Sequence, residues 1–206
     1  MSEPFIRKFP RVHLQKSLTE VFKELEAHVV WPNLEISDVV DLSYKGLAAR
    51  KPALHTVSTG AKLPLEVMLG RNERFSVQGK AVWQTPDAIG FEIDSLSAES
   101  HRALAKYMDP NLLGSTLRPV DKSFFASGQS FDYWFQGPQG THVLIWLKEG
   151  RAIGRVQVDL NGQSVEFFAS QPRTQPTVSE QQALLLLSQI DQSQVAMDEF
   201  LRHLGG

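Results

Sequence analysis

Asp41-Leu42-Ser43-Tyr44-Lys45-Gly46 offers a carboxylate, a hydroxyl and a glycine at fixed spacing. An earlier stretch, Arg7-Lys8-Phe9-Pro10-Arg11, places two arginines four residues apart. An arginine fork can donate two hydrogen bonds to guanine O6 and N7 or clamp a phosphate, and its flat face can stack on a base. A carboxylate can accept from the ring N–H and the amino group of guanine. Together the two stretches indicate a receptor for a guanine nucleotide more clearly than an enzyme.

The order Arg-x-x-x-Arg followed by Asp-x-Ser-x-x-Gly resembles the signature of PilZ domains, which are bacterial receptors for the second messenger cyclic di-GMP. Three later stretches are similar to the later strands of that fold: Leu63–Leu69, Gly79–Trp83 and Ile89–Glu92. A helical stretch from about Ser97 to Met108 falls where the family has its closing helix. The resemblance covers about residues 5–110 and implies a small antiparallel β-barrel.

The resemblance also implies roles for five residues. Arg7 and Arg11 would grip guanine and phosphate groups from a mobile arm, Asp41 and Ser43 would meet the other guanine, and Gly46 would shape the turn. We expect Gly46 to adopt a backbone conformation closed to other residues, and replacement of Arg11 to change stability little. Taken singly, the arginines are better explained as solvated charges, and Asp, Ser and Gly as an ordinary turn. The strand pattern that follows favours nucleotide binding.

Strand signals follow both stretches. Alternating apolar and polar residues, with turns at Gly60, Gly70 and Pro86, suggest short strands of a small barrel. The predicted strands run near residues 35–42, 46–50, 63–69, 75–85 and 88–94. A further strand is expected at His28–Trp31, delayed by a helical insertion that begins with the capping box at residues 17–20.

The second half of the chain predicts a separate unit. Residues 110–130 are rich in loop-forming residues, and Pro110 is expected to end the helix that Ser97 caps. This divides the chain into domains at 1–112 and 122–206. The second domain is expected to be a four-stranded β meander, because Asn161-Gly162 between alternating stretches is a strong hairpin signal.

A long helix over residues 178–204 is predicted to close the chain. Ala183, Leu187, Ile190, Met197 and Leu201 follow heptad spacing, interrupted by one polar residue, Gln194. Two interpretations stay open. The favoured one is a cover for the meander within one chain, and the other is a homo-oligomer formed through helix 178–204.

Composition excludes several function classes. The 206 residues carry 21 basic and 23 acidic side chains, a formal net charge of −2, so no bulk positive field favours nucleic acid or anionic lipid. There is no cysteine, which excludes disulfides and thiolate metal sites. Neither a signal peptide nor an apolar run long enough to span a membrane is evident, so we expect a cytoplasmic protein.

Motifs for chemistry are also lacking. The chain has no Walker loop, no Gly-x-Ser-x-Gly elbow and no His-Glu-x-x-His, and its six histidines have no metal-ligand spacing. We therefore expect no catalytic residues, no metal and no cofactor apart from cyclic di-GMP as ligand. Trp83, Trp134 and Trp146 lie in strand patterns and are expected in the core.

Three functions remain. The leading one is a cyclic di-GMP receptor that relays binding to an unknown protein partner. The alternative is a protein-interaction module with a PilZ-like fold that binds no nucleotide. An enzyme that acts on a phosphorylated small molecule ranks lowest, because no base, metal or nucleophile set is visible.

Overall fold

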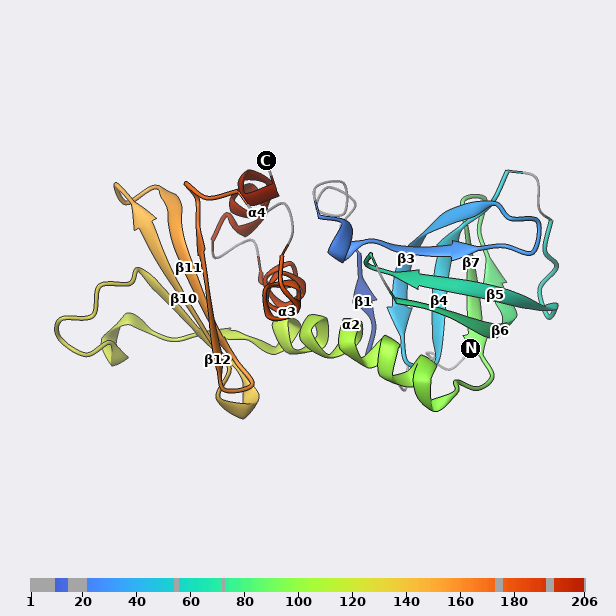
Figure 1. Cartoon of the computed structure of the whole chain (residues 1–206), viewed down its shortest axis with the longest axis horizontal. Coiled ribbons are helices and arrows are strands. Elements are labelled where there is room, and N and C mark those ends of the chain that lie inside the picture. The colour runs from blue at the N-terminus through green and yellow to red at the C-terminus, as the bar shows by residue number, and fades with distance from the viewer. Residues whose placement is uncertain are drawn as a thin grey trace, which may run out of the picture. The chain divides into compact units, whose positions relative to one another are not determined.

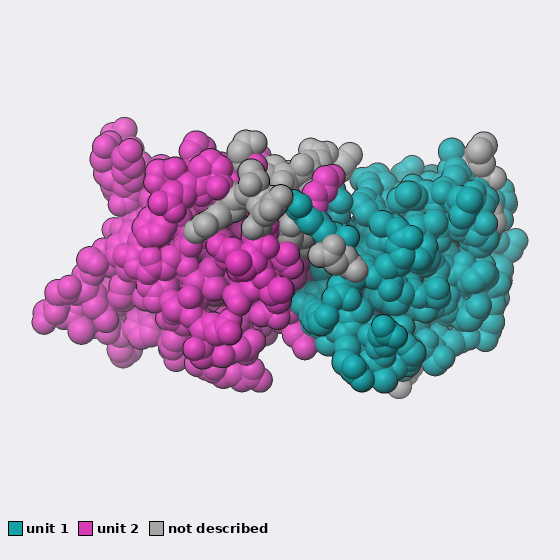
Figure 2. Space-filling model, viewed as in Figure 1, with its two compact units in different colours: residues 1–14, 25–108 teal, residues 15–24, 109–206 magenta. Residues whose placement is uncertain are grey.

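The computed structural model describes residues 10–14, 22–53, 56–71, 73–172, 176–191 and 195–205. The chain divides into two compact units, shown in different colours in Figure 2. Unit 1 comprises residues 1–14 and 25–108, and unit 2 comprises residues 15–24 and 109–206. Residues 15–24 therefore belong with the second unit, although they lie between two strands of the first in the sequence.

Unit 1 is a closed antiparallel β-barrel (Figure 1). Its six strands follow the order β3-β2-β5-β6-β7-β4, and the ring closes because β4 pairs with both β7 and β3. They are β2 (Ala27–Val30), β3 (Ile36–Ser43), β4 (Gly46–Arg50), β5 (Lys62–Leu69), β6 (Glu73–Gln84) and β7 (Ala88–Ile93). The five strands predicted between residues 35 and 94 are confirmed with nearly the same ends, and β2 is the delayed strand expected at His28–Trp31.

Alternating side chains fill the barrel. Leu65 and Val67 of β5 are buried, while the residues between them point outward, as the two-residue period of a strand requires. Trp31 is also buried, packs edge-on against Phe91 with 5.6 Å between ring centroids, and donates from Nε1 to Ser37 Oγ at 2.9 Å. Its polar atom is thus satisfied inside the barrel.

Two short elements precede β2. Strand β1 (Val12–His13) pairs with β3. A single 3-10 turn, η1 (Lys23–Leu25), leads into β2. The capping box predicted at residues 17–20 lies outside the described residues.

The closing helix, α2 (Ala98–Thr116), begins as predicted, because Ser97 Oγ accepts from the Ser100 N–H at 3.0 Å. The expectation that Pro110 ends it is wrong, since the helix runs six residues further. A proline removes one backbone hydrogen bond. Beyond it, Asn111 is buried and Gly114 packs against the Leu186 carbonyl, so tertiary packing holds the helix together.

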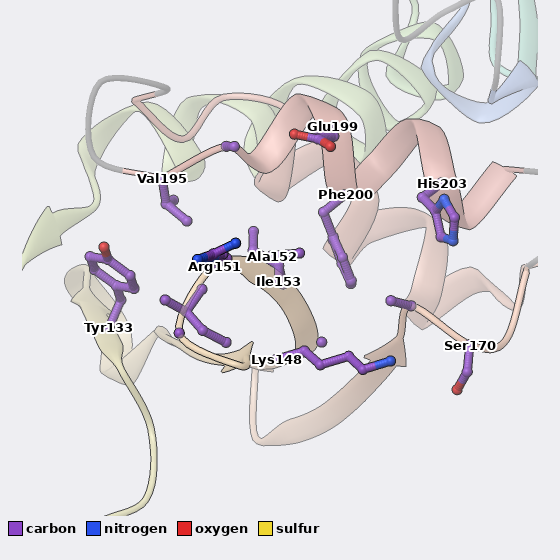
Figure 3. A pocket seen from close by; sticks show the side chains of 15 residues that line it. Tyr133, Lys148, Arg151, Ala152, Ile153, Ser170, Val195, Glu199, Phe200 and His203 are labelled. Atoms are coloured by element: carbon purple, nitrogen blue, oxygen red, sulfur yellow. The ribbon is translucent and has the colours of Figure 1, made fainter.

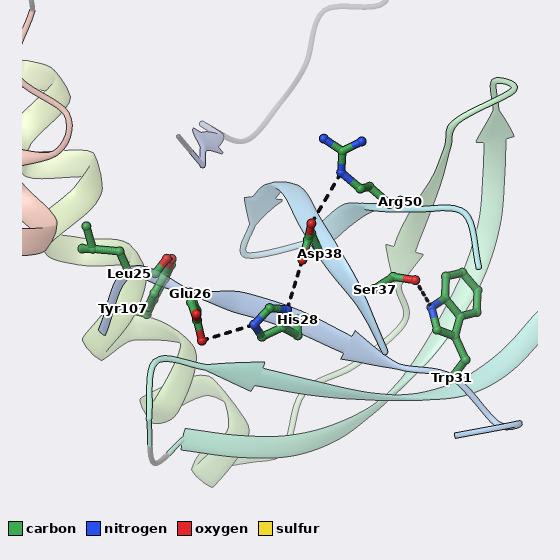
Figure 4. Close-up of polar contacts among 8 residues, drawn as sticks. All are labelled: Leu25, Glu26, His28, Trp31, Ser37, Asp38, Arg50 and Tyr107. Atoms are coloured by element: carbon green, nitrogen blue, oxygen red, sulfur yellow. Dashed lines mark hydrogen bonds and ion pairs between the residues drawn. The ribbon is translucent and has the colours of Figure 1, made fainter. Parts of the chain in front are cut away.

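Tyr107 ties α2 to the barrel. Its buried hydroxyl donates to the Leu25 carbonyl at 2.6 Å (Figure 4). Burial, and then the nearby Glu26 carboxylate, raise the pKa of Tyr107 far above its usual range, so the donor stays protonated.

Unit 2 contains one antiparallel sheet in the order β12-β11-β10-β9-β8. Its strands are β8 (Arg118–Pro119), β9 (Tyr133–Gln136), β10 (His142–Lys148), β11 (Ala152–Leu160) and β12 (Gln163–Phe168), with 3-10 turns η2 (Lys122–Phe124) and η3 (Pro138–Gly140) between β8 and β10. The last four strands are the predicted meander, and β8 adds a two-residue edge. Asn161 and Gly162 both have positive φ, 52° and 75°, which confirms the predicted hairpin turn.

The single helix predicted over residues 178–204 is wrong. The structure has α3 (Val178–Leu187), opened by a capping box of Thr177 and Glu180, and α4 (Met197–Gly205). The residues that α3 buries are consecutive, Ala183 to Leu187, so its second half is enclosed on all sides and presents no single heptad stripe. The chain turns after Ser188, and α4 begins a second apolar stripe with Met197 and Leu201. Gln194 lies outside the described residues.

These two helices cover the sheet of their own unit. Helix α3 packs on β12 and α4 packs on β11, as the favoured interpretation expected. No helix among the described residues is long and apolar enough to cross a membrane.

Candidate functional site on the outer face of the barrel

A β-bulge in β3 determines where Asp41 points. Val39 pairs with Ala49 and Asp41 pairs with Ala48, so Val40 is an extra residue on β3. In a regular strand Asp41 would share the inward face of Val39, because side chains alternate. The bulge shifts the alternation by one residue, so Val39 and Leu42 both enter the core and Asp41 turns to the outer face.

A second bulge does the same for Trp83 in β6. Ala81 pairs with Phe91 and Trp83 pairs with Gly90, which leaves Val82 as the extra residue. Trp83 is 37% exposed, so the expectation that it lies in the core is wrong. A Cβ on Gly90 would overlap the indole, which places the ring of Trp83 directly over that glycine.

Strand pairing joins these residues into one row. Asp41 is paired with Ala48, Ala48 with Gly90, and Gly90 with Trp83, across β3, β4, β7 and β6. Directly paired residues of antiparallel strands have Cβ atoms about 5 Å apart. The row therefore has a carboxylate at one end and an indole at the other, with a floor of alanine and glycine between them.

Arg11 meets this row at its carboxylate end. Val12 pairs with Leu42 and His13 with Asp41, so β1 holds the preceding arginine beside β3. The Arg11 guanidinium donates from Nη1 to Asp41 Oδ1 and forms an ion pair. Asp41 is only 7% exposed, and in this structure its charge is balanced by Arg11. Arg7 lies outside the described residues.

Ser43 and Gly46 shape the turn that follows. The Ser43 hydroxyl is buried and donates to the Gly46 carbonyl at 3.0 Å. A Cβ on Gly46 would overlap the Phe91 carbonyl oxygen. Gly46 does not have a positive φ, so the expected reason for this glycine is wrong. The position requires glycine because β4 approaches β7 closely, not because of an unusual backbone conformation.

A second row of charged side chains lies beside the first on the outer face (Figure 4). Arg50 Nε is 3.5 Å from Asp38 Oδ2. The ring of His28 lies between two carboxylates, 3.4 Å from Asp38 Oδ1 and 3.4 Å from Glu26 Oε2. The side chain of Arg50 is 54% exposed and leaves donors available to a ligand on this face.

The structure therefore brings together Arg11, Asp41, Ser43 and Gly46 from the predicted site. It adds Trp83 and Arg50, which the sequence analysis missed. In the described part of the chain, no cluster of three or more His, Asp or Glu side chains is arranged to hold a metal ion.

Comparison with known proteins gives one family match. The model of the PilZ domain matches residues 5–109 of the 206. No protein of curated function matches the chain.

Two solved structures are similar to about half of the chain. One is the PilZ domain with c-di-GMP of YcgR from Escherichia coli, at 16% identity and a TM-score of 0.36, covering 48% of this chain and 86% of that one. The other is the uncharacterized protein Lpg0364 of Legionella, at 10% identity and a TM-score of 0.35, covering 48% and 90%. On the family match, with the closed six-stranded barrel, the chain belongs to the PilZ domain family.

Proposed function

We propose that this protein is a cyclic di-GMP receptor that binds the dinucleotide on the outer face of its barrel. PilZ domains form a family of cyclic di-GMP receptors, and residues 5–109 match that family. The observation that supports the proposal most directly is the meeting of Arg11 with Asp41 at one end of the row that Trp83 closes at the other.

The row suits a guanine base. The Asp41 carboxylate can accept from the N1–H and amino group of guanine, whereas adenine carries an acceptor at N1. Between Asp41 and Trp83 the row carries only the methyl group of Ala48 and Gly90, which lies under the indole, so no bulky side chain separates the carboxylate from the Trp83 surface on which a base can stack. Stacking of a base on an aromatic side chain contributes about 1–3 kcal/mol.

Arg11 has to change partner when the ligand binds. It covers the buried Asp41, so a guanine edge reaches that carboxylate only as the guanidinium moves aside. The released fork can then grip a phosphate or the O6 and N7 edge of a guanine. Arg50, on the neighbouring row, supplies a second cation for the phosphates.

Unit 2 would then be the output side. The family match ends at residue 109, so the ligand-binding part corresponds to the predicted domain 1–112 and the meander to a domain that contacts a protein partner. In this scheme the protein has no catalytic activity of its own and acts in the cytoplasm, where it would meet the second messenger.

One observation favours the alternative, a protein-interaction module that binds no nucleotide. Arg11 and Asp41 neutralise each other in the structure, and an ion pair of this kind can serve the fold alone. The two functions differ in whether cyclic di-GMP competes successfully for these side chains.

Isothermal titration calorimetry of the full chain separates the two. We expect binding of cyclic di-GMP in preference to cyclic di-AMP, and at least tenfold weaker binding by Arg11→Ala, because a charge-assisted contact contributes about 1.5–3 kcal/mol. Asp41→Ala should lose mainly the preference for guanine. Arg102→Ala is the matched control, since Arg102 is an exposed arginine of α2 in the same unit. No heat with cyclic di-GMP well above micromolar concentration would refute the receptor and leave the interaction module.

A further inference from the structure

Unit 2 contains a pocket of about 870 Å³ between the β10–β11 hairpin and α4 (Figure 3). Apolar side chains line it: Ile153 of β11, Phe200 of α4, and Val195, which precedes α4. The volume lies within the range of about 300–1,000 Å³ that is usual for small-molecule sites. An inorganic ion would fill only a small part of it, so an occupant needs an apolar body.

Basic side chains surround the opening. Lys148 and Arg151 flank the hairpin turn, in which Glu149 and Gly150 have positive φ of 53° and 68°. In Figure 3 the Lys148 ammonium extends toward the side of Ser170, while Arg151 lies toward the opposite side. The two cations therefore lie at separate points of one opening.

Within the described residues, the side chains of Lys148, Arg151 and His203 make no ion pair. Among the described residues that line the pocket, Glu199 is the one acidic side chain and stands against Lys148 and Arg151, so this lining carries a net positive charge even with His203 neutral. An anionic group at the opening would gain a charge-assisted contact with Lys148 or with Arg151.

We propose that this pocket binds a small amphipathic anion, with its carboxylate, sulfonate or phosphate at the opening beside Lys148 or Arg151 and its apolar body toward Ile153 and Phe200. The site is separate from the barrel and does not depend on the proposed binding of cyclic di-GMP. It would give the protein a second, chemically different input.

Decanoate, used below its micellar concentration, is a suitable probe because it combines a carboxylate with an apolar chain. Titration into the full chain should show binding at one site, and decyltrimethylammonium of the same chain length should bind at least tenfold more weakly. Lys148→Gln combined with Arg151→Gln should weaken decanoate binding about tenfold or more. Arg202→Gln, an exposed basic residue of α4 that does not line the pocket, is the matched control and should bind like the parent.

Two further variants keep the test sharp. Ala152→Trp fills the opening from an exposed position of the hairpin and should block decanoate while the chain stays folded, as checked by circular dichroism. Arg102→Ala, at an exposed arginine of unit 1, should leave decanoate binding unchanged. Equal binding of the cationic and anionic probes, no binding of decanoate, or a loss caused by Arg102→Ala instead of by the pocket variants would overturn the proposal.

Discussion

Arg11 and Asp41 illustrate how one contact changes the expected effect of a mutation. The sequence alone predicts that an arm residue such as Arg11 contributes little to stability. In the structure Arg11 balances the charge of a carboxylate that is almost fully buried. Removing one partner of such a pair leaves the other without compensation.

Arg11→Ala should therefore destabilise the protein even without ligand. We expect the free energy of unfolding to fall by about 1–3 kcal/mol, the cost of an unsatisfied buried group. Urea denaturation of parent and variant measures the difference. The double variant Arg11→Ala with Asp41→Asn should recover part of the loss, because the buried group is then neutral. A single variant as stable as the parent would mean that the ion pair does not persist in solution.

Trp83 gives a second residue-scale prediction, which rests on the proposed receptor function. Trp83→Ala should weaken cyclic di-GMP binding roughly tenfold, because it removes a stacking surface worth about 1–3 kcal/mol. Trp83→Phe should retain most of the affinity. Calorimetric titration compares them, with Val82→Ala, a change at the exposed neighbouring residue, as control. Parental affinity in Trp83→Ala would exclude the indole from the site.

The sequence predicted which residue types meet at the candidate site, but not its full extent. Arg11, Asp41, Ser43 and Gly46 form a recognisable spacing, whereas Trp83 in a strand pattern suggests a core position. The available signal was a slip in alternation, since Val39 and Leu42 both face the core three residues apart. Such an interruption of the alternation identifies a β-bulge only when the partner strand is known, because the sequence of one strand does not specify which residues it pairs with.

At the scale of elements, local patterns predicted strands well and helix ends poorly. Strand β5 has buried residues at every second position, so its own sequence specifies it. The course of α2 beyond Pro110 and the break after Leu187 depend on packing against other elements. The leucines of α3 are consistent both with a heptad stripe and with a helix buried on all sides. Only the elements that pack around α3 distinguish these two arrangements.

Gly114 gives a prediction at this scale. Alanine is favoured over glycine in a helix interior by about 1 kcal/mol, so propensity alone predicts that Gly114→Ala stabilises the protein. A Cβ at this position would overlap the Leu186 carbonyl oxygen of α3, and backbone cannot give way as a flexible side chain does. Overpacking costs about 1–3 kcal/mol, so we expect net destabilisation.

Thermal unfolding followed by circular dichroism would test this, with Leu113→Ala as a comparison at the neighbouring, partly exposed position of the same helix. An increase in the melting temperature of Gly114→Ala would show that α2 and α3 are not in close contact in solution.

In the whole molecule, the two compact units are not two consecutive segments of the chain. Unit 2 takes in residues 15–24, which stand between β1 and β2 in the sequence, and Phe22 among them is buried. A segment of ten residues is too short to differ recognisably in composition from its surroundings. The sequence therefore indicates a domain boundary only at the loop-forming residues 110–130.

This path suggests how binding could be relayed, if the barrel binds cyclic di-GMP. Arg11 stands just before β1, and the residues that follow β1 are those of unit 2. A ligand that draws Arg11 away from Asp41 removes the ion pair that holds the chain just before β1, and so changes how firmly the N-terminal end of residues 15–24 is held. A ligand shifts an equilibrium only through such a difference between states.

Hydrogen exchange of the full chain, followed by mass spectrometry, would measure the relay. Saturating cyclic di-GMP should slow exchange in β1 and at the β3–β4 turn, and should also alter exchange in residues 15–24. The Asp41→Ala chain at the same nucleotide concentration is the control and should respond much less. Protection confined to β1, β3 and β4 would mean that the barrel binds the nucleotide but does not pass the signal through this segment, because a coupled segment must change its stability when the ligand shifts the population.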